Sequence, residues 1–167
     1  MTRAACSTSR RPSATGGATE AALELYRRRA AVDGWDEETF YALYQAALME
    51  DRLGRPEATE TLQEAWNLRP TRAEPLYQLA RINRLRRRFH LSWIFASLAV
   101  SVPRPDDLLF VEDWVYRWAA RFEFADAAWR IGENERAART ARELLRDGAL
   151  PEDHREHLEL ILRSLTG

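Results

Sequence analysis

Apolar side chains recur three and four residues apart along most of the chain. This spacing predicts amphipathic helices, and because no useful stretch alternates with a period of two, it predicts no β-sheet. Breaks are expected where proline, glycine or a capping residue interrupts the pattern. The expected helices span about residues 18–31, 37–53, 56–68, 72–88, 89–100, 108–131 and 134–148, with a last one from 151 onward.

The apolar pattern also repeats with a period of 34 residues. The first copy consists of Ala58, Leu62, Ala65 and Pro70. The second copy, one period later, consists of Ser92, Ala96 and Ala99, with Pro103 one place early. The third copy, which follows an added segment of about one short helix, consists of Gly132, Ala137, Ala141 and Leu144, with Pro151 two places late. Small and large apolar positions at this period are typical of stacked helix pairs of the tetratricopeptide (TPR) type.

This repeat predicts an all-α protein, a right-handed TPR-like alpha-alpha superhelix (solenoid) of about three helix pairs. An extra helix is expected near residues 107–119, and the helix from 151 onward is expected to cap the exposed end of the array. The helix at 89–100 has little polar face and should be buried on several sides. Residues 1–17 carry few large apolar side chains and are expected to be a disordered tail, with residues 18–167 as the repeat domain.

Charge and composition narrow the classes of function. The formal net charge of -1 argues against general affinity for nucleic acid or for anionic membranes. All 25 basic residues are arginine. Chemistry that requires a lysine, such as a Schiff base or the lysine-bearing phosphate loop, is therefore excluded.

Cys6 is the only cysteine, so neither an internal disulfide nor a cysteine-based zinc site is expected. The chain has no apolar run long enough for a membrane span and no apolar core of a signal peptide. The expected location is therefore the cytoplasm.

Four segments, read in order, resemble a known family. They are residues 34–38 (GWDEE), 40–44 (FYALY), 69–77 (RPTRAEPLY) and 105–112 (PDDLLFVE). They are similar to the TPR-like helical region found C-terminal to the catalytic domain in bacterial family 2 glycosyltransferases, and the resemblance covers about residues 20–147. It departs from the ordinary TPR pattern at Tyr44, where glycine or alanine is usual.

The resemblance implies that nucleotide-sugar chemistry belongs to a separate upstream domain with a metal-binding Asp-x-Asp motif. This chain has no such motif. It therefore resembles a detached accessory or remnant segment, to which no catalytic residue of the family carries over. No enzyme activity, cofactor or metal is expected.

Arginines gather in the fourth expected helix and suggest a binding groove. The cluster consists of Arg81, Arg84, Arg86, Arg87 and Arg88. Aligned to the period, the residues expected to line the inner groove are Tyr77, Arg81, Arg84, Phe122, Asp126 and Trp129. Arginine forks beside aromatic faces suit an acidic peptide, a terminal carboxylate or a phosphate-bearing ligand. The alternative is a solvated basic helix end neutralised by neighbouring carboxylates.

Two further clusters are weaker candidates for a metal-binding or catalytic site. His154 and His157, with Asp153 and Glu156 beside them, can share a metal in principle, but no third ligand stands at a recognisable spacing, which favours an exposed polar face. Asp106 and Asp107 fit an N-cap and first helical turn better than an acid–base pair, although Glu112 and Asp113 lie close by. Thr71 and Glu74 have the spacing of a capping box.

Three functional hypotheses follow. The first is a non-enzymatic interaction module that holds a protein or acidic peptide in a concave groove. The second is a segment that works with a glycosyltransferase, positioning its acceptor or mediating assembly. The third is a small enzyme that uses the carboxylates near Asp106.

Overall fold

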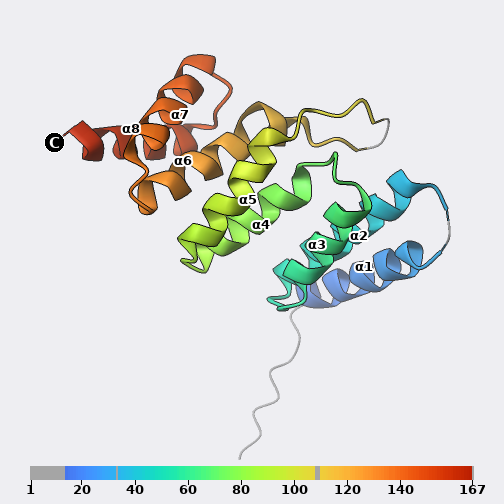
Figure 1. Cartoon of the computed structure of the whole chain (residues 1–167). Coiled ribbons are helices and arrows are strands. Elements are labelled where there is room, and N and C mark those ends of the chain that lie inside the picture. Colours follow the sequence, from blue (N-terminus) through green and yellow to red (C-terminus); the bar gives the residue numbers. More distant parts are fainter. Residues whose placement is uncertain (1–13, 33, 108–109, 167) are drawn as a thin grey trace, which may run out of the picture.

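The computed structural model describes residues 14–32, 34–107 and 110–166, and every regular element in these ranges is helical (Figure 1). The all-α class predicted from the apolar spacing is confirmed. The elements are α1 (Ala14–Ala30), α2 (Asp36–Arg52), α3 (Ala58–Leu68), α4 (Glu74–Leu85), α5 (Phe89–Ser101), a π-helical turn η1 (Val115–Ala119), α6 (Ala120–Arg130), α7 (Asn134–Asp147) and α8 (Glu152–Thr166). Helix α1 begins four residues before the predicted start, and residues 1–13 of the predicted tail lie outside the described part.

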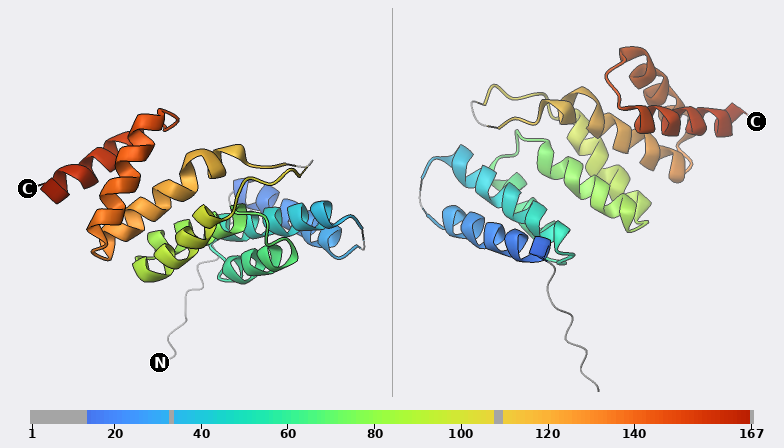
Figure 2. Two further views of the ribbon diagram at one scale, coloured as in Figure 1. Left: turned by 45° about the horizontal axis from the view of Figure 1, so that its top comes forward. Right: turned by 180° about the vertical axis from the view of Figure 1, so that it is seen from behind.

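Each helix packs mainly on its neighbours in the sequence. The pairs α2–α3, α4–α5 and α6–α7 lie in a row, with α1 at one end and α8 at the other (Figures 1 and 2). Residues of the 34-residue period form the buried faces of the second helix in each pair. These buried residues are Ala58, Leu62 and Ala65 in α3, Ser92, Ala96 and Ala99 in α5, and Ala137, Ala141 and Leu144 in α7.

Glycine ends three of the helices, as the sequence pattern predicts. Gly54, Gly132 and Gly148 follow α2, α6 and α7 with φ angles of 69°, 86° and 69°. Residues with a side chain rarely adopt this left-handed backbone, because Cβ then crowds the carbonyl oxygen. The chain therefore turns sharply at these points and the next helix packs back on the one before.

The helix predicted to start at residue 108 starts later. Residues 102–107 and 110–112 are not helical, Leu108 and Leu109 lie outside the described part, and regular helix begins at Asp113. Buried side chains replace the missing helical bonds: Arg72 Nη2 donates to the carbonyl of Phe110 at 3.0 Å, and the amide of Glu112 donates to Glu74 Oε1 at 3.2 Å. The extra helix predicted near 107–119 is thus wrong in its first half, and η1 forms its second half.

Helix α5 was expected to be buried on several sides, and it is not. It packs on α4 and α6, and small residues fill those contacts. Phe95 packs against the core clusters around Leu62 and Leu76, but aliphatic side chains remain outside: Leu91, Ile94 and Leu98 keep 43%, 47% and 39% of their surface exposed. An apolar composition cannot show how many neighbours a helix has, because that depends on the stacking of the whole chain.

Candidate binding groove

Helix α4 and the η1–α6 segment bring the two halves of the predicted groove together. Tyr77, Arg81 and Arg84 come from α4, and the other predicted residues, Phe122, Asp126 and Trp129, come from α6. Arg84 joins the two helices, because its Nε and Nη2 donate to Glu123 Oε2 and Oε1 at 2.7 and 3.0 Å.

The predicted groove arginines already have carboxylate partners. Arg81 pairs with Asp51 and donates from Nε to Gln78 Oε1 at 2.8 Å. Glu123, the partner of Arg84, is 2% exposed. Burial raises the pKa of Glu123 above its usual value, and the contact with Arg84 opposes that rise. An acidic ligand at these arginines would therefore compete with carboxylates that the fold itself supplies.

The five-arginine cluster is divided in the structure. Arg86, Arg87 and Arg88 are exposed in the turn between α4 and α5, where Arg87 has a φ angle of 57°. Arg81 and Arg84 lie earlier on α4 and point toward α2 and α6. The sequence cluster is therefore two features, an inner pair of bridging arginines and an outer basic turn.

Aromatic rings form a continuous row that begins on α4 and follows the η1–α6 segment and α8. Neighbouring ring centroids are 4.5 to 6.4 Å apart. In order, the row consists of Tyr77, Trp114, Trp118, His154, Phe122, His157 and Trp129. Edge-to-face and tilted contacts of this kind are favourable and fix the ring orientations. The two histidines from α8, predicted as an exposed polar face, are members of this row.

Two hollows open along the row. The first has a volume of about 360 Å³ and is lined by Asp113, Trp114, Arg117, Trp118 and Ala149. The second has a volume of about 180 Å³ and is lined by Arg84, Phe122, Asp153, His154 and His157. The contact of Trp118 with His154, at 4.8 Å between centroids, lies between the two hollows. We refer to this surface, from Trp114 to His157, as the aromatic groove.

Asp126 supports the groove from beneath. Its carboxylate is fully buried and lies 2.6 Å from His157 Nε2 and 3.0 Å from Arg130 Nε. Burial alone would raise the pKa of Asp126, but the hydrogen bonds with His157 and Arg130 hold it below its usual value. Asp126 therefore anchors a groove histidine. The sequence pattern instead predicts Asp126 on the inner surface of the groove, but its buried side chain does not face a ligand there.

The carboxylates near Asp106 form structural contacts. Asp107 accepts bonds from Arg69 Nη2 at 2.6 Å and Arg72 Nη1 at 3.1 Å, so it does not cap a helix as predicted. Glu112 accepts a bond from Tyr44 Oη at 2.9 Å. Burial raises the pKa of Glu112. Among the described residues, no three His, Cys, Asp or Glu side chains are grouped so that they could hold a metal ion.

A buried polar network around Arg72 and Glu74 was not anticipated from the sequence. Arg72 is 2% exposed, donates to Glu74 from Nη2 at 2.7 Å, and lies 4.5 Å from the centroid of the Phe40 ring. Tyr116 Oη donates to Glu74 Oε2 at 2.7 Å and accepts from the amide of Ala73 at 3.0 Å. The predicted capping box is therefore wrong: Ala73 is the N-cap of α4, and Glu74 is an internal ion-pair partner. Nothing in the spacing of Thr71 and Glu74 distinguishes the two roles.

Comparisons with known protein families, with curated proteins and with solved structures found no match. Within the described ranges, no helix combines the length and apolar character needed to cross a bilayer.

Proposed function

We propose that this protein is a non-enzymatic interaction module whose aromatic groove holds a segment of a peptide or partner protein. The observation that carries the proposal is the unbroken row of rings with a hollow on each side of the Trp118–His154 contact. Aromatic side chains supply much of the binding energy at protein interfaces because they bury large areas and lose little rotamer freedom. A stack of helix pairs presents such a surface on a rigid support.

The groove chemistry favours an apolar or aromatic anchor in the ligand. Arg81 and Arg84 are bound to Asp51 and Glu123, so they offer little to an acidic peptide. Trp114 is 37% exposed at the wider hollow, where Asp113 and Arg117 provide polar rims. We therefore expect the ligand to place one large apolar side chain against Trp114, with a hydrogen-bonding group on either side.

A selection from a random displayed-peptide library, followed by calorimetry on the purified chain, tests the proposal. We expect Trp114→Ala to weaken the selected peptides by about tenfold or more, because buried aromatic anchors are energetically dominant. Trp35→Ala, which removes a 48% exposed tryptophan outside the groove, is the matched control and should leave affinity unchanged. Equal binding by wild type and Trp114→Ala, or failure to select any peptide, would contradict the proposal.

A second candidate function is assistance to a glycosyltransferase, by positioning an acceptor or mediating assembly. One observation favours it: three of the four segments that carry the family resemblance meet in the Arg72–Glu74 network. Tyr44 belongs to the segment 40–44, Arg72 to 69–77, and Asp107 and Glu112 to 105–112. Their co-occurrence thus has a structural reason, since they are contacting parts of one unit.

Genomic context and co-purification test this second candidate. We expect a neighbouring reading frame to encode a family 2 glycosyltransferase domain with an Asp-x-Asp motif, and the two products to elute together when co-expressed. A neighbourhood without such a frame, or separate elution of the two proteins, would count against it.

A further inference from the structure

The second helices of the three pairs share one outer face of the molecule. Figures 1 and 2 show α3, α5 and α7 in succession along the row, with α5 in the middle. The exposed positions of α3 and α5 correspond across the 34-residue period. Glu57, Glu60 and Glu64 stand one period before Leu91, Ile94 and Leu98. These two sets therefore occupy the same place on neighbouring helices.

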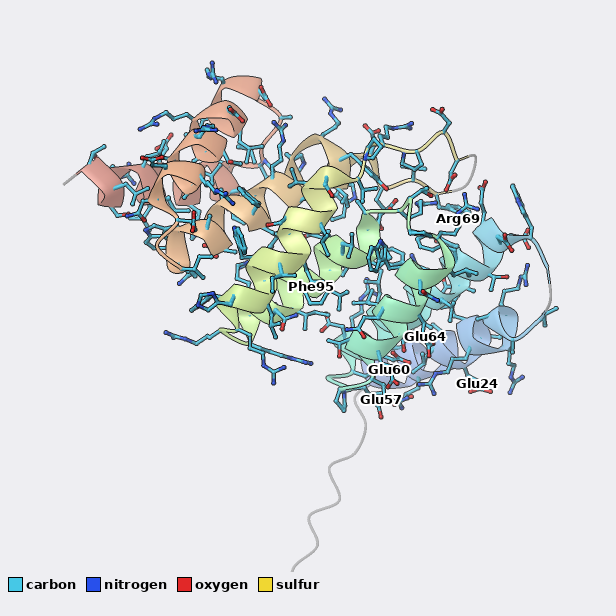
Figure 3. All side chains as sticks on the ribbon, viewed as in Figure 1. Glu24, Glu57, Glu60, Glu64, Arg69 and Phe95 are labelled. Carbon is cyan, nitrogen blue, oxygen red and sulfur yellow. The ribbon has the colours of Figure 1, made fainter. Side chains whose placement is uncertain are left out.

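The α3 part of this face is acidic. Figure 3 shows Glu57, Glu60 and Glu64 along α3, with Phe95 on α5 beside it. All three glutamates are exposed, and none of them takes part in any of the ion pairs found among the described residues. They form an acidic band on one side of α5.

The middle part is apolar. Leu91, Ile94 and Leu98 lie three and four residues apart and each keep about two fifths or more of their surface exposed. Contiguous aliphatic surface of this kind favours a protein partner.

The α7 part is basic. Arg139, Arg142 and Arg146 are exposed and line a hollow of about 490 Å³ together with Leu165. Glu135 and Glu143 also border this hollow, so its charged lining of three arginines and two glutamates is net positive. None of these three arginines belongs to an ion pair within the described residues. By the offset that relates Tyr77 to Phe122, Arg139 holds the place on α7 that Ile94 holds on α5, and Arg142 and Arg146 extend the basic surface toward Leu165 of α8. The acidic, apolar and basic bands thus follow one another on α3, α5 and α7.

We propose that this outer face binds a second copy of the same chain in a two-fold dimer. A two-fold axis that lies in the interface and runs along α5 places the aliphatic residues of the two copies together. The same axis places the acidic band of each copy over the basic band of the other. An axis across α5 would instead oppose glutamates to glutamates, which is unfavourable.

Charge complementarity selects a second copy over an unrelated partner. A partner for this face needs a basic band and an acidic band on opposite sides of an apolar strip, and the chain itself presents that arrangement. Contacts between two identical faces close as a dimer and do not extend into filaments. The inner aromatic groove lies on other elements, η1, α6 and α8, and stays available in the dimer.

Sedimentation of the full chain from micromolar to near-millimolar concentration tests the dimer. We expect a monomer–dimer equilibrium that weakens in high salt, because the flanking bands are solvent-exposed charges. Ile94→Glu should weaken association by more than about tenfold, since it buries a carboxylate in the apolar band. Leu160→Glu changes an equally exposed leucine on α8 and should leave association unchanged.

Charge reversal tests the orientation. Glu60→Arg and Arg139→Glu should each weaken the dimer, and the double variant should restore it, because each change then meets its complement across the axis. Circular dichroism confirms that each variant folds. A wild type that stays monomeric, an Ile94→Glu variant that dimerises normally, or a double variant without recovery would each overturn the proposal.

Discussion

At the scale of single residues, the buried charge of Arg72 determines the path of the chain around it. Arg72 is almost completely buried, and its guanidinium contacts Glu74, Asp107, the carbonyl of Phe110 and the face of the Phe40 ring. Removing an ion pair from water costs several kcal/mol per charge, which only close and complete hydrogen bonding offsets. The non-helical path of residues 102–107 and 110–112 is the consequence, because these residues supply two of the partners.

Arg72→Leu is expected to destabilise the chain by about 3–5 kcal/mol, because it leaves Glu74 buried without its cation. The double variant Arg72→Leu with Glu74→Leu should recover much of that loss, since no unpaired charge remains. Chemical denaturation of the three proteins measures both effects. A double variant as unstable as the single one would show that packing of Arg72, and not its charge, stabilises this region.

At the scale of elements, the sequence predicts those features of the helices that depend on residues close together in the chain. The buried faces of α3 and α7 follow from small residues at fixed spacing, and the ends of α2, α6 and α7 follow from glycine. The start of the η1–α6 segment was not predictable. The apolar spacing is helical from residue 108 onward, whereas the helix in the structure begins at Asp113. Distant acceptors and donors, Glu74 and Arg72, decide that boundary.

The docking of α8 on α6 should depend on pH through Asp126. Its pKa is lowered in the folded protein, so the ionised carboxylate stabilises the fold. This contribution is complete above the unfolded-state pKa of about 3.9 and is lost as the pH falls through the lowered folded-state pKa. Asp126→Asn is expected to cost about 1–3 kcal/mol near neutral pH, where it weakens the bonds to His157 and Arg130.

Unfolding curves at a series of pH values measure this dependence. The stability difference between wild type and Asp126→Asn should be constant above about pH 5 and should shrink below about pH 4. Glu156→Gln, an exposed carboxylate on α8, provides the control. A difference that stays constant down to the most acidic conditions would mean that the charge of Asp126 does not hold α8.

At the scale of the whole molecule, the hydrophobic core is a chain of linked clusters. Phe95 packs against the cluster around Leu62 and against the one around Leu76, and Trp118 packs against the latter and against the cluster around Leu158. Each helix contacts mainly its sequence neighbours. Stability should therefore be transmitted from neighbour to neighbour and should not be shared equally by all parts.

Hydrogen exchange on two cavity variants tests this view. Leu62→Ala is expected to lower amide protection mainly in α2, α3 and α4, and Leu158→Ala mainly in α6, α7 and α8. Both leucines are fully buried, so each change should cost about 2–5 kcal/mol. Equal loss of protection throughout the chain in both variants would show a single cooperative unit instead.

The predicted site residues come from α4 and α6, two helices that the structure joins through Arg84 and Glu123. The period placed them at equivalent positions of stacked helices. It did not reveal that Arg81 and Arg84 are paired, or that Asp126 is buried, because those facts depend on Asp51, Glu123 and residues of α8. The histidines of α8 had no sequence pattern that placed them beside Phe122.

The sequence by itself determined the all-α class, the number and approximate limits of most helices, and the buried faces of the second helix in each pair. These features depend on residues within one or two helical turns of each other. Only the tertiary structure decided the extended path before η1, the exposed aliphatic band on α5, the pairing of the groove arginines and the aromatic groove itself. Each of these features depends on contacts between residues that are distant in the sequence. The local spacing of apolar residues does not determine such contacts.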